Sequence, residues 1–371
     1  QLEPEFLAVV LGALVYTGEI VVALPQGQKK LDSAEMDRLA RMQASVLAEF
    51  THIELPRSMP VTELRALFEL LGLQPGLVVT ETTLEQAVHE LQVRVKQLAP
   101  QVAKAYSQVA MGLTFWNQPL LSEAEQVEWK KSLKALADFV DGLQAYNTTG
   151  KLKNFRYDLA TVQAQKPNLE LLHAYHSLSE LLDKAQGLVT YLSHAEGTLP
   201  SSHRWRQQLK EVRAKLQSDF VNPATRDQAT FEQSLLHQLR TLKNAYVADY
   251  RELHQKARLS PSQEAKRQSY LRDTRYVQLS ALSAILLFPR TEFQALQDDL
   301  AGMKACVPLS GQELETTTVC PYCQYRPVDE EPVKFMPALL DGMDERLDAL
   351  LEKVTRSLLD NLNDPTVREN I

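Results

Sequence analysis

Residues 82–109, TTLEQAVHELQVRVKQLAPQVAKAYSQV, carry an apolar residue at intervals that alternate between four and three. The repeated positions are Leu84, Val88, Leu91, Val95, Leu98, Val102, Ala105 and Val109. This spacing places all eight on one stripe of an α-helix. Pro100 lies inside the pattern, and because proline lacks a backbone N–H we expect a kink or a break there.

The same pattern returns twice further along the chain. Ser122 and Glu125 form a capping-box sequence ahead of the second seam, and Gly197 follows the third. The second seam is Trp129, Leu133, Leu136, Val140 and Leu143, and the third is Leu171, Tyr175, Leu178, Leu182, Ala185, Val189 and Leu192. Successive seams in one chain favour antiparallel hairpins that pack on each other over an extended oligomeric coiled coil.

The first 78 residues have a mixed character. A helix is expected over Glu5–Tyr16, and the β-branched run Glu19–Leu24 and the short segment His52–Leu55 read as two strands. Helices capped near Asp32 and spanning Thr62–Leu73 complete the pattern. The order predicts a small α+β unit, either winged-helix-like or a simple cap on the helical region.

The composition is that of a helical globular protein. The 371 residues include 44% hydrophobic and 23% charged residues, only 13 Gly, and a formal net charge of -7, which excludes a histone-like basic protein. The apolar run Phe6–Val15 is about half as long as a bilayer span and has no basic region before it, so no membrane segment or signal peptide is expected. Three cysteines fit a reducing, cytoplasmic location. The opening residue Gln1 and an immediate apolar helix suggest a piece of a longer polypeptide.

The cysteines carry the clearest chemical signal. Cys320-Pro-Tyr-Cys323 has the spacing of a zinc knuckle, and Cys306 precedes it by 14 residues. No Cys or His follows Cys323, so the fourth ligand would be a His from the helical region, a carboxylate such as Asp329, or a water. One structural zinc is the favoured interpretation, with plain structural cysteines and a redox pair as alternatives.

A basic stretch stands out inside the acidic chain. Residues 203–276 hold 15 Lys and Arg against 8 Asp and Glu. This surface is a candidate contact for nucleic acid or an acidic partner, and a solvated helix face is the alternative. The candidate contact residues are Arg204, Arg206, Lys210, Arg213, Lys266, Arg267, Arg272 and Arg275.

Motifs of catalysis and nucleotide binding are missing from the sequence. It has no P-loop, no Gly-x-Ser-x-Gly and no Gly-x-Gly-x-x-Gly. We therefore expect no catalytic residues and no nucleotide bound by this chain.

Two passages together resemble a known family. They are Pro4–Leu24, PEFLAVVLGALVYTGEIVVAL, and Val319–Pro327, VCPYCQYRP. The combination is similar to the C-terminal region of large P-loop ATPases of bacterial phage-defence systems, of the BREX and phage-growth-limitation type. The resemblance implies an ATP-binding domain outside this chain, and a role for this part as a platform for other phage-defence proteins, the rest of its own polypeptide, or DNA.

The sequence predicts a mainly α protein in four parts. These are a small α+β unit at 1–78, a long antiparallel helical bundle with coiled-coil character at 79–300, a Cys-x2-Cys loop at 301–335, and a C-terminal helix at 336–371. The favoured function is a non-catalytic scaffold region of an antiphage ATPase. The alternatives are a stand-alone nucleic-acid-binding module with a structural zinc and, less favoured, an enzyme with an open zinc site.

Overall fold

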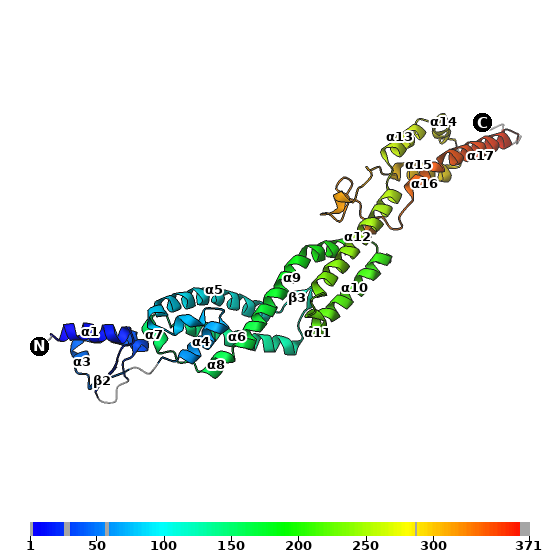
Figure 1. Ribbon diagram of the computed structural model, residues 1–371. Coiled ribbons are helices and arrows are strands. Elements are labelled where there is room, and N and C mark those ends of the chain that lie inside the picture. The colour runs from blue at the N-terminus through cyan, green and yellow to red at the C-terminus, as the bar shows by residue number, and fades with distance from the viewer. Residues whose placement is uncertain (1–2, 26–29, 56–58, 286–287, 364–371) are drawn as a thin grey trace. The chain divides into compact units, whose positions relative to one another are not determined.

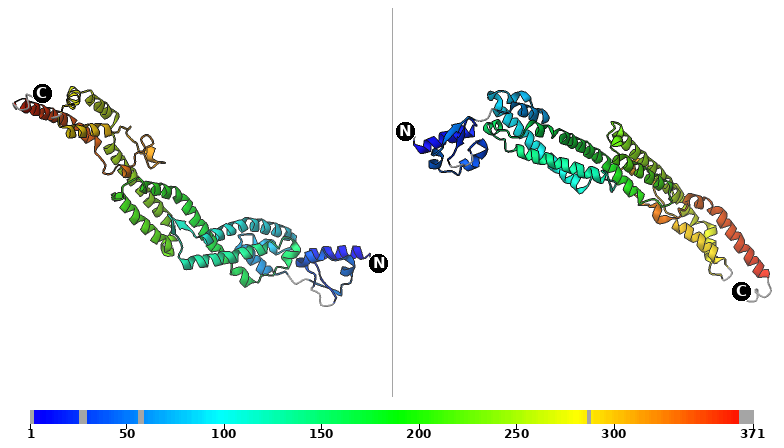
Figure 2. Two further views of the ribbon diagram at one scale, coloured as in Figure 1. Left: turned by 180° about the vertical axis from the view of Figure 1, so that it is seen from behind. Right: turned by 90° about the horizontal axis from the view of Figure 1, so that it is seen from below.

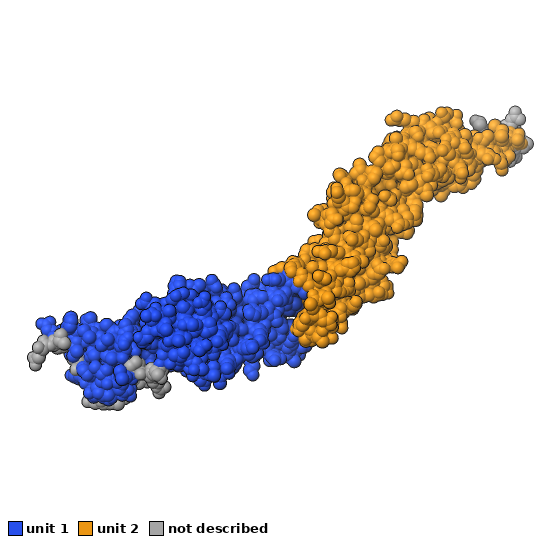
Figure 3. Space-filling view, in the orientation of Figure 1, with its two compact units in different colours: residues 1–182 blue, residues 183–371 orange. Residues whose placement is uncertain are grey.

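The computed structural model describes residues 3–25, 30–55, 59–285 and 288–363. The chain forms two compact units, residues 1–182 and 183–371, which Figure 3 shows in blue and orange. Helices dominate both units, and the strands form two small antiparallel sheets. The predicted mainly α fold class, with a small α+β part at the N-terminal end, is confirmed (Figure 1).

The α+β part is built on one two-stranded sheet. Strand β1 (Val21–Ala23) pairs antiparallel with β2 (His52–Glu54), as expected. The apolar face of α1 (Pro4–Tyr16) closes a small core of Leu11, Val15, Val22, Leu24, Leu31 and Leu47. The helix expected near Asp32 is shorter than predicted, with a 3-10 turn at Ser33–Glu35 followed by α2 (Met36–Leu39). A short α3 (Ala44–Ala48), which was not predicted, packs on α1.

The predicted helical hairpin follows α4 (Val61–Leu70). Helix α5 (Leu84–Met111) packs along α6 (Glu123–Leu143), and the two lie side by side in Figures 1 and 2. Between them, β3 (Thr114–Phe115) and β4 (Gln118–Pro119) form a hairpin. Its two central residues have φ of 53° and 63°, as a two-residue turn of the type I′ family requires.

The seam of α5 is buried as its spacing predicts, with one exchange. Val88 is only half-buried, and its neighbour Ala87 faces the core instead. The expected break at Pro100 is wrong, because α5 runs through it without interruption. Pro100 is exposed, and so is Lys96, whose carbonyl would otherwise accept the missing hydrogen bond. Water can therefore hydrate that carbonyl, which lowers the cost of the proline.

Two glycines fix the contact between α1 and α7 (Thr149–Lys153). A Cβ on Gly150 would lie 2.2 Å from the carbonyl oxygen of Tyr16, and one on Gly18 would lie 2.8 Å from the Cα of Gly150. The buried Ser33 hydroxyl donates to the Gly150 carbonyl at 2.8 Å and secures the same contact. Helices α8 (Leu159–Gln163) and α9 (Lys166–Glu196) follow, and α9 ends just before Gly197, as predicted.

The second unit contains two groups of helices. Helices α10 (Arg204–Val221), α11 (Pro223–Arg226) and α12 (Phe231–Ala257) form the first, where the buried indole N–H of Trp205 donates to the Leu242 carbonyl at 2.9 Å. The second group is α13 (Pro261–Tyr270), α14 (Thr274–Leu282), α15 (Arg290–Gly302), α16 (Met336–Asp341) and α17 (Met343–Asn363), which share one apolar core. The expected single C-terminal helix is therefore two elements that meet at Gly342, and residues 364–371 lie outside the described part.

The close contact between Gly18 and Gly150 predicts that a methyl group at Gly150 lowers the stability of the fold, whereas one at a glycine with free space around it does not. Gly150→Ala forces the α1 and α7 backbones apart, and we expect a loss of about 1–3 kcal/mol in the free energy of unfolding. Gly187→Ala in α9 is the matched control, because its Cβ meets no atom within 4 Å and alanine favours a helix over glycine by about 1 kcal/mol. Thermal or urea unfolding of the two variants measures the difference. A Gly150→Ala protein as stable as the wild type would contradict the contact.

Candidate metal centre

A stripe of aromatic side chains on α12 holds the segment that carries the cysteines. We call residues 303–335, between α15 and α16, the Cys loop. Tyr246, Tyr250 and His254 are spaced four residues apart, so they share one face of α12, and all three are buried. The Tyr246 hydroxyl donates to the Thr318 carbonyl. The Tyr250 hydroxyl accepts a hydrogen bond from the Cys320 N–H at 2.7 Å and donates one to the Tyr325 carbonyl at 2.6 Å.

Cys306 is placed by a separate backbone contact. Its N–H donates to the Leu259 carbonyl at 2.9 Å, and the Leu259 N–H donates to the Lys304 carbonyl at 2.9 Å. Leu259 follows the end of α12 by two residues, so this short parallel bridge brings Cys306 beside the last turn of the helix.

Cys320 and Cys323 lie on a tight turn. The Gln324 N–H donates to the Cys320 carbonyl at 3.0 Å, which closes the turn and brings both sulfurs to the same side. Gln324 has a φ of 52°, in the left-handed region that glycine adopts more easily. The turn therefore has the hydrogen bond and the backbone reversal that suit two metal ligands separated by two residues.

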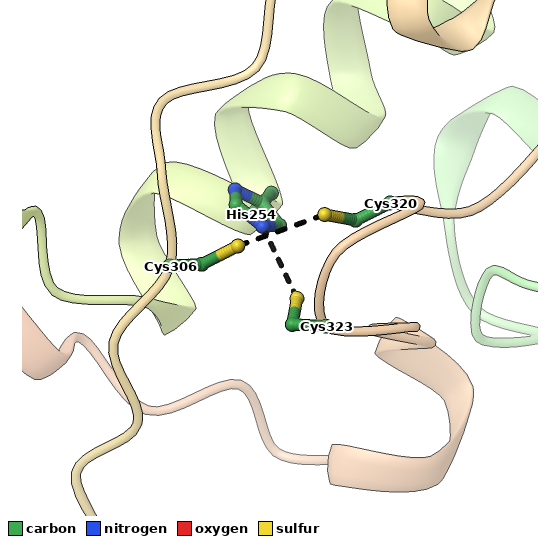
Figure 4. A group of neighbouring side chains, drawn as sticks. All are labelled: His254, Cys306, Cys320 and Cys323. Atoms are coloured by element: carbon green, nitrogen blue, oxygen red, sulfur yellow. Dashed lines mark hydrogen bonds between the residues drawn. The ribbon is translucent and has the colours of Figure 1, made fainter.

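The four side chains converge on one point (Figure 4). The ligand atoms of His254, Cys306, Cys320 and Cys323 all lie within 4.8 Å of one another. The Cys306 and Cys320 sulfurs are 3.7 Å apart, and the Cys323 sulfur is 3.4 Å from His254 Nε2. A tetrahedral ion with bonds of about 2.3 Å to sulfur and about 2.0 Å to nitrogen would separate these pairs by about 3.8 Å and about 3.5 Å. The cluster could therefore hold a metal ion with little rearrangement.

The protonation states of the cluster also favour a cation. Burial, together with the nearby Arg258 charge, lowers the pKa of His254 to about 4, so the imidazole is neutral at pH 7 and can act as a ligand. Burial raises the pKa of Cys306 to about 12, and hydrogen bonds from Cys323 and Cys320 add to the shift. Three thiolates this close repel one another unless a positive ion replaces their protons.

Arg258 supplies a buried positive charge next to the cluster. Arg258 directly follows Ala257, the last residue of α12, and is only 5% exposed. Its guanidinium donates to both oxygens of Glu330 at 2.8 Å and lies 4.3 Å from the centre of the Tyr325 ring. Hydrogen bonds with Glu330 and Cys323 outweigh the effect of burial and raise the pKa of Arg258. Three thiolates around a divalent ion carry one net negative charge, which Arg258 would offset.

The sequence identified three of these four residues. Of the expected classes of fourth ligand, the structure places a histidine of the helical region, His254, beside the cysteines. Asp329 lies elsewhere and pairs with Arg326 at 3.2 Å. The signal that could have found His254 is its spacing of four and eight residues from Tyr250 and Tyr246, which predicts one buried face.

The candidate basic contact residues fall into two groups. Four of them are paired with carboxylates of the same unit: Arg213 with Glu196, Lys266 with Asp341, Arg267 with Glu264, and Arg275 with Asp273, Asp344 and Asp348. Arg206 donates to the Leu199 carbonyl at 3.2 Å. Arg204, Lys210 and Arg272 are exposed and form no ion pair within the described residues. Together with Arg206, these are the candidates without a carboxylate partner in the part of the chain that the structure describes, and of the four only Arg204, Lys210 and Arg272 are exposed.

Comparison with known proteins identifies the family. Models of the Family of unknown function (DUF6079) match at residues 1–55 for its 4th domain, 60–254 for its 5th and 262–353 for its 6th. The 5th-domain match alone covers more than half of the chain, so the chain belongs to this family, and the matched parts are domains of a larger multi-domain family. No curated protein and no solved structure matches the chain. No described helix is both long and apolar enough to cross a membrane.

The ion pair of Arg267 predicts a specific pH dependence. Hydrogen bonds from Arg267 hold the pKa of Glu264 at about 2 in the folded chain, below its ordinary value of 4.5. The pair therefore stabilises the fold above about pH 4.5, and this contribution is lost as the pH falls towards about 2. We expect Glu264→Gln to lower the melting temperature at pH 7, with the difference from wild type shrinking between pH 4.5 and 2. The exposed Glu211→Gln serves as the control, and a difference independent of pH would contradict the assignment.

The exposed cations Arg204, Lys210 and Arg272 test the nucleic-acid interpretation of the basic stretch. We expect the triple variant Arg204→Glu, Lys210→Glu, Arg272→Glu to weaken binding of double-stranded DNA, with a smaller dependence of affinity on salt because fewer phosphates are neutralised. Fluorescence anisotropy at several salt concentrations measures both effects. Unchanged affinity in the triple variant would exclude these three residues as the nucleic-acid contact.

Proposed function

We propose that this member of the DUF6079 family is a non-catalytic scaffold region in which one structural zinc ion fastens the Cys loop to α12. The observation that supports the proposal is the convergence of His254, Cys306, Cys320 and Cys323 within 4.8 Å. Three sulfurs and one imidazole are the donors that zinc prefers in structural sites.

The number of protein ligands favours structure over catalysis. Catalytic zinc sites keep a position open for water or substrate, whereas a closed set of four side chains leaves none. Two of the four candidate ligands, Cys320 and His254, are buried, and Cys306 and Cys323 are partly buried. These features argue for a structural ion and against the open zinc site of an enzyme.

The Cys loop has little regular secondary structure and few buried apolar side chains. Its regular structure is limited to two 3-10 turns, Gln312–Leu314 and Pro327–Glu330, and its buried apolar side chains include Leu309 and Leu314. A loop with so small an apolar core depends on hydrogen bonds and on the metal for its position. Zinc would thus convert an irregular segment into a fixed surface of the second unit.

We also propose that the scaffold serves a phage-defence ATPase and binds other defence proteins or other parts of its own polypeptide. The resemblance of Pro4–Leu24 and Val319–Pro327 to that ATPase family supports this role, as does membership of a multi-domain family. Helix α1 adds independent support, because Phe6 and Val9 are 57% and 69% exposed on one side of it. Exposed apolar side chains on one helix face are typical of a surface that packs on another protein or domain.

Metal content tests the proposal directly. Elemental analysis of protein purified without chelator should find one zinc per chain, and the double variant Cys320→Ser, Cys323→Ser should lose it together with a large fall in melting temperature. His254→Ala should also lose zinc or bind it much more weakly. His237→Ala is the matched control, because His237 is exposed on the same helix and should change neither quantity.

The outcomes separate the proposal from its alternatives. Absence of metal from the wild-type protein, even after zinc is added back, would make the cysteines ordinary packing residues. Zinc that persists at full occupancy in His254→Ala, with unchanged chelator resistance, would exclude His254 as the fourth ligand and reopen the possibility of a water-bound ion.

A further inference from the structure

A cavity lies beside the Cys loop, on the side of the loop that faces α9. Its volume is about 790 Å³, and residues of α9, α12 and the segment 315–319 form its walls. The side chains that matter to its chemistry are Lys184, Tyr191, Arg240, Lys243, Glu315 and Thr316–Thr318. All of them belong to the second unit.

Three cations line this cavity. Lys243 is the most buried of them, with its side chain 15% exposed, and its ammonium donates to the backbone carbonyl and the carboxylate of Glu315, both at 2.8 Å. It also lies 4.8 Å from the centre of the Tyr191 ring. Lys184 pairs with Glu232 at 2.7 Å, whereas Arg240 is exposed and forms no ion pair among the described residues.

The wall formed by residues 315–319 adds neutral hydrogen-bonding groups to the cavity. Thr316, Thr317 and Thr318 are consecutive and contribute hydroxyl groups, of which that of Thr317 already donates to the Glu313 carbonyl at 2.9 Å. The backbone N–H groups of Thr318 and Val319 have no acceptor within the described part of the chain. Glu315 is the one carboxylate among the described residues that line the cavity, and it already pairs with Lys243.

We propose that this cavity binds a ligand through a phosphate group. A surface rich in donors and cations selects a ligand that offers several acceptors and negative charge. The volume is in the range of small-molecule sites and exceeds what a single phosphate fills. Glu315 is 67% exposed, so its carboxylate can swing away when phosphate oxygens take its place on Lys243. The phosphate can belong to a free small molecule or to the end of a nucleic-acid strand.

The site is coupled to the metal centre through the chain itself. Val319 directly precedes Cys320, and the Thr318 carbonyl accepts the hydrogen bond from Tyr246 on the stripe that leads to His254. Losing the metal would release the wall that carries the threonines. This coupling rests on the proposed structural zinc, while the phosphate site itself does not.

Calorimetric titration of the zinc-loaded protein with inorganic pyrophosphate tests the site. We expect binding that weakens about tenfold or more in Arg240→Gln, since a charge-assisted hydrogen bond contributes about 1.5–3 kcal/mol. Arg240 is exposed, so this variant should fold normally, and Lys243→Gln should weaken binding further. Lys215→Gln, an exposed lysine of α10 outside the cavity, is the control and should bind as the wild type does.

A single-stranded oligonucleotide, with and without a 5′-phosphate, identifies the source of the phosphate. Binding of pyrophosphate that depends on Arg240 supports a small-molecule ligand, and binding of only the phosphorylated strand, with the same dependence, supports a nucleic-acid end. No binding of either probe, or binding unaffected by Arg240→Gln, would overturn the proposal. Pyrophosphate binding retained in Cys320→Ser would overturn the coupling to the metal but leave the site intact, so the two failures can be told apart.

Discussion

The convergence of three cysteines and one histidine is the constraint on which the position of the Cys loop depends. Hydrogen bonds with the tyrosines of α12, and the backbone bridge beyond its end, bring Cys306, Cys320 and Cys323 together, and burial raises the pKa of Cys306. The neutral imidazole of His254 completes a donor set that could hold a metal ion. The tyrosine hydroxyls fix the backbone of the Cys loop, and a bound ion would fix its side chains, so the two kinds of contact reinforce each other.

Charged side chains of alternating sign lie next to the cluster, just beyond the end of α12. Arg258 faces Cys323 and Glu330, and Glu330 in turn accepts a hydrogen bond from Lys304 at 2.9 Å. Lys304 is two residues before Cys306, so this series of charged side chains ends beside another of the candidate metal ligands. Of these three charged residues only Arg258 is buried, and a buried charge is tolerated only when it has a partner, so loss of Glu330 would leave Arg258 uncompensated.

Local periodicity explains what the sequence could predict, and long-range packing explains what it could not. The seams of α5, α6 and α9 were recognisable because burial repeats every three or four residues, and the exchange of Val88 for Ala87 shows how little such a pattern fixes the exact rotation of a helix. The Cys-Pro-Tyr-Cys turn was recognisable because both ligands are local. His254 lies 52 residues before Cys306 in the sequence, and no spacing rule links them. Likewise, the sequence predicted Lys266 and Arg275 as partner contacts, because it could not show that the fold places Asp341 and Asp344 beside them.

The distance in sequence between His254 and the cysteines also determines how long after His254 the cysteines leave the ribosome. Cys323 is 69 residues beyond His254, so at about 5–20 residues per second it leaves the ribosome roughly 3 to 14 seconds later. Throughout that interval Tyr250 and His254 lack the Cys-loop residues that contact them in the finished protein. His254 is moreover the last residue of the 5th-domain match, and the cysteines belong to the 6th. A nascent chain arrested between the two domains would therefore leave this part of α12 without its Cys-loop partners.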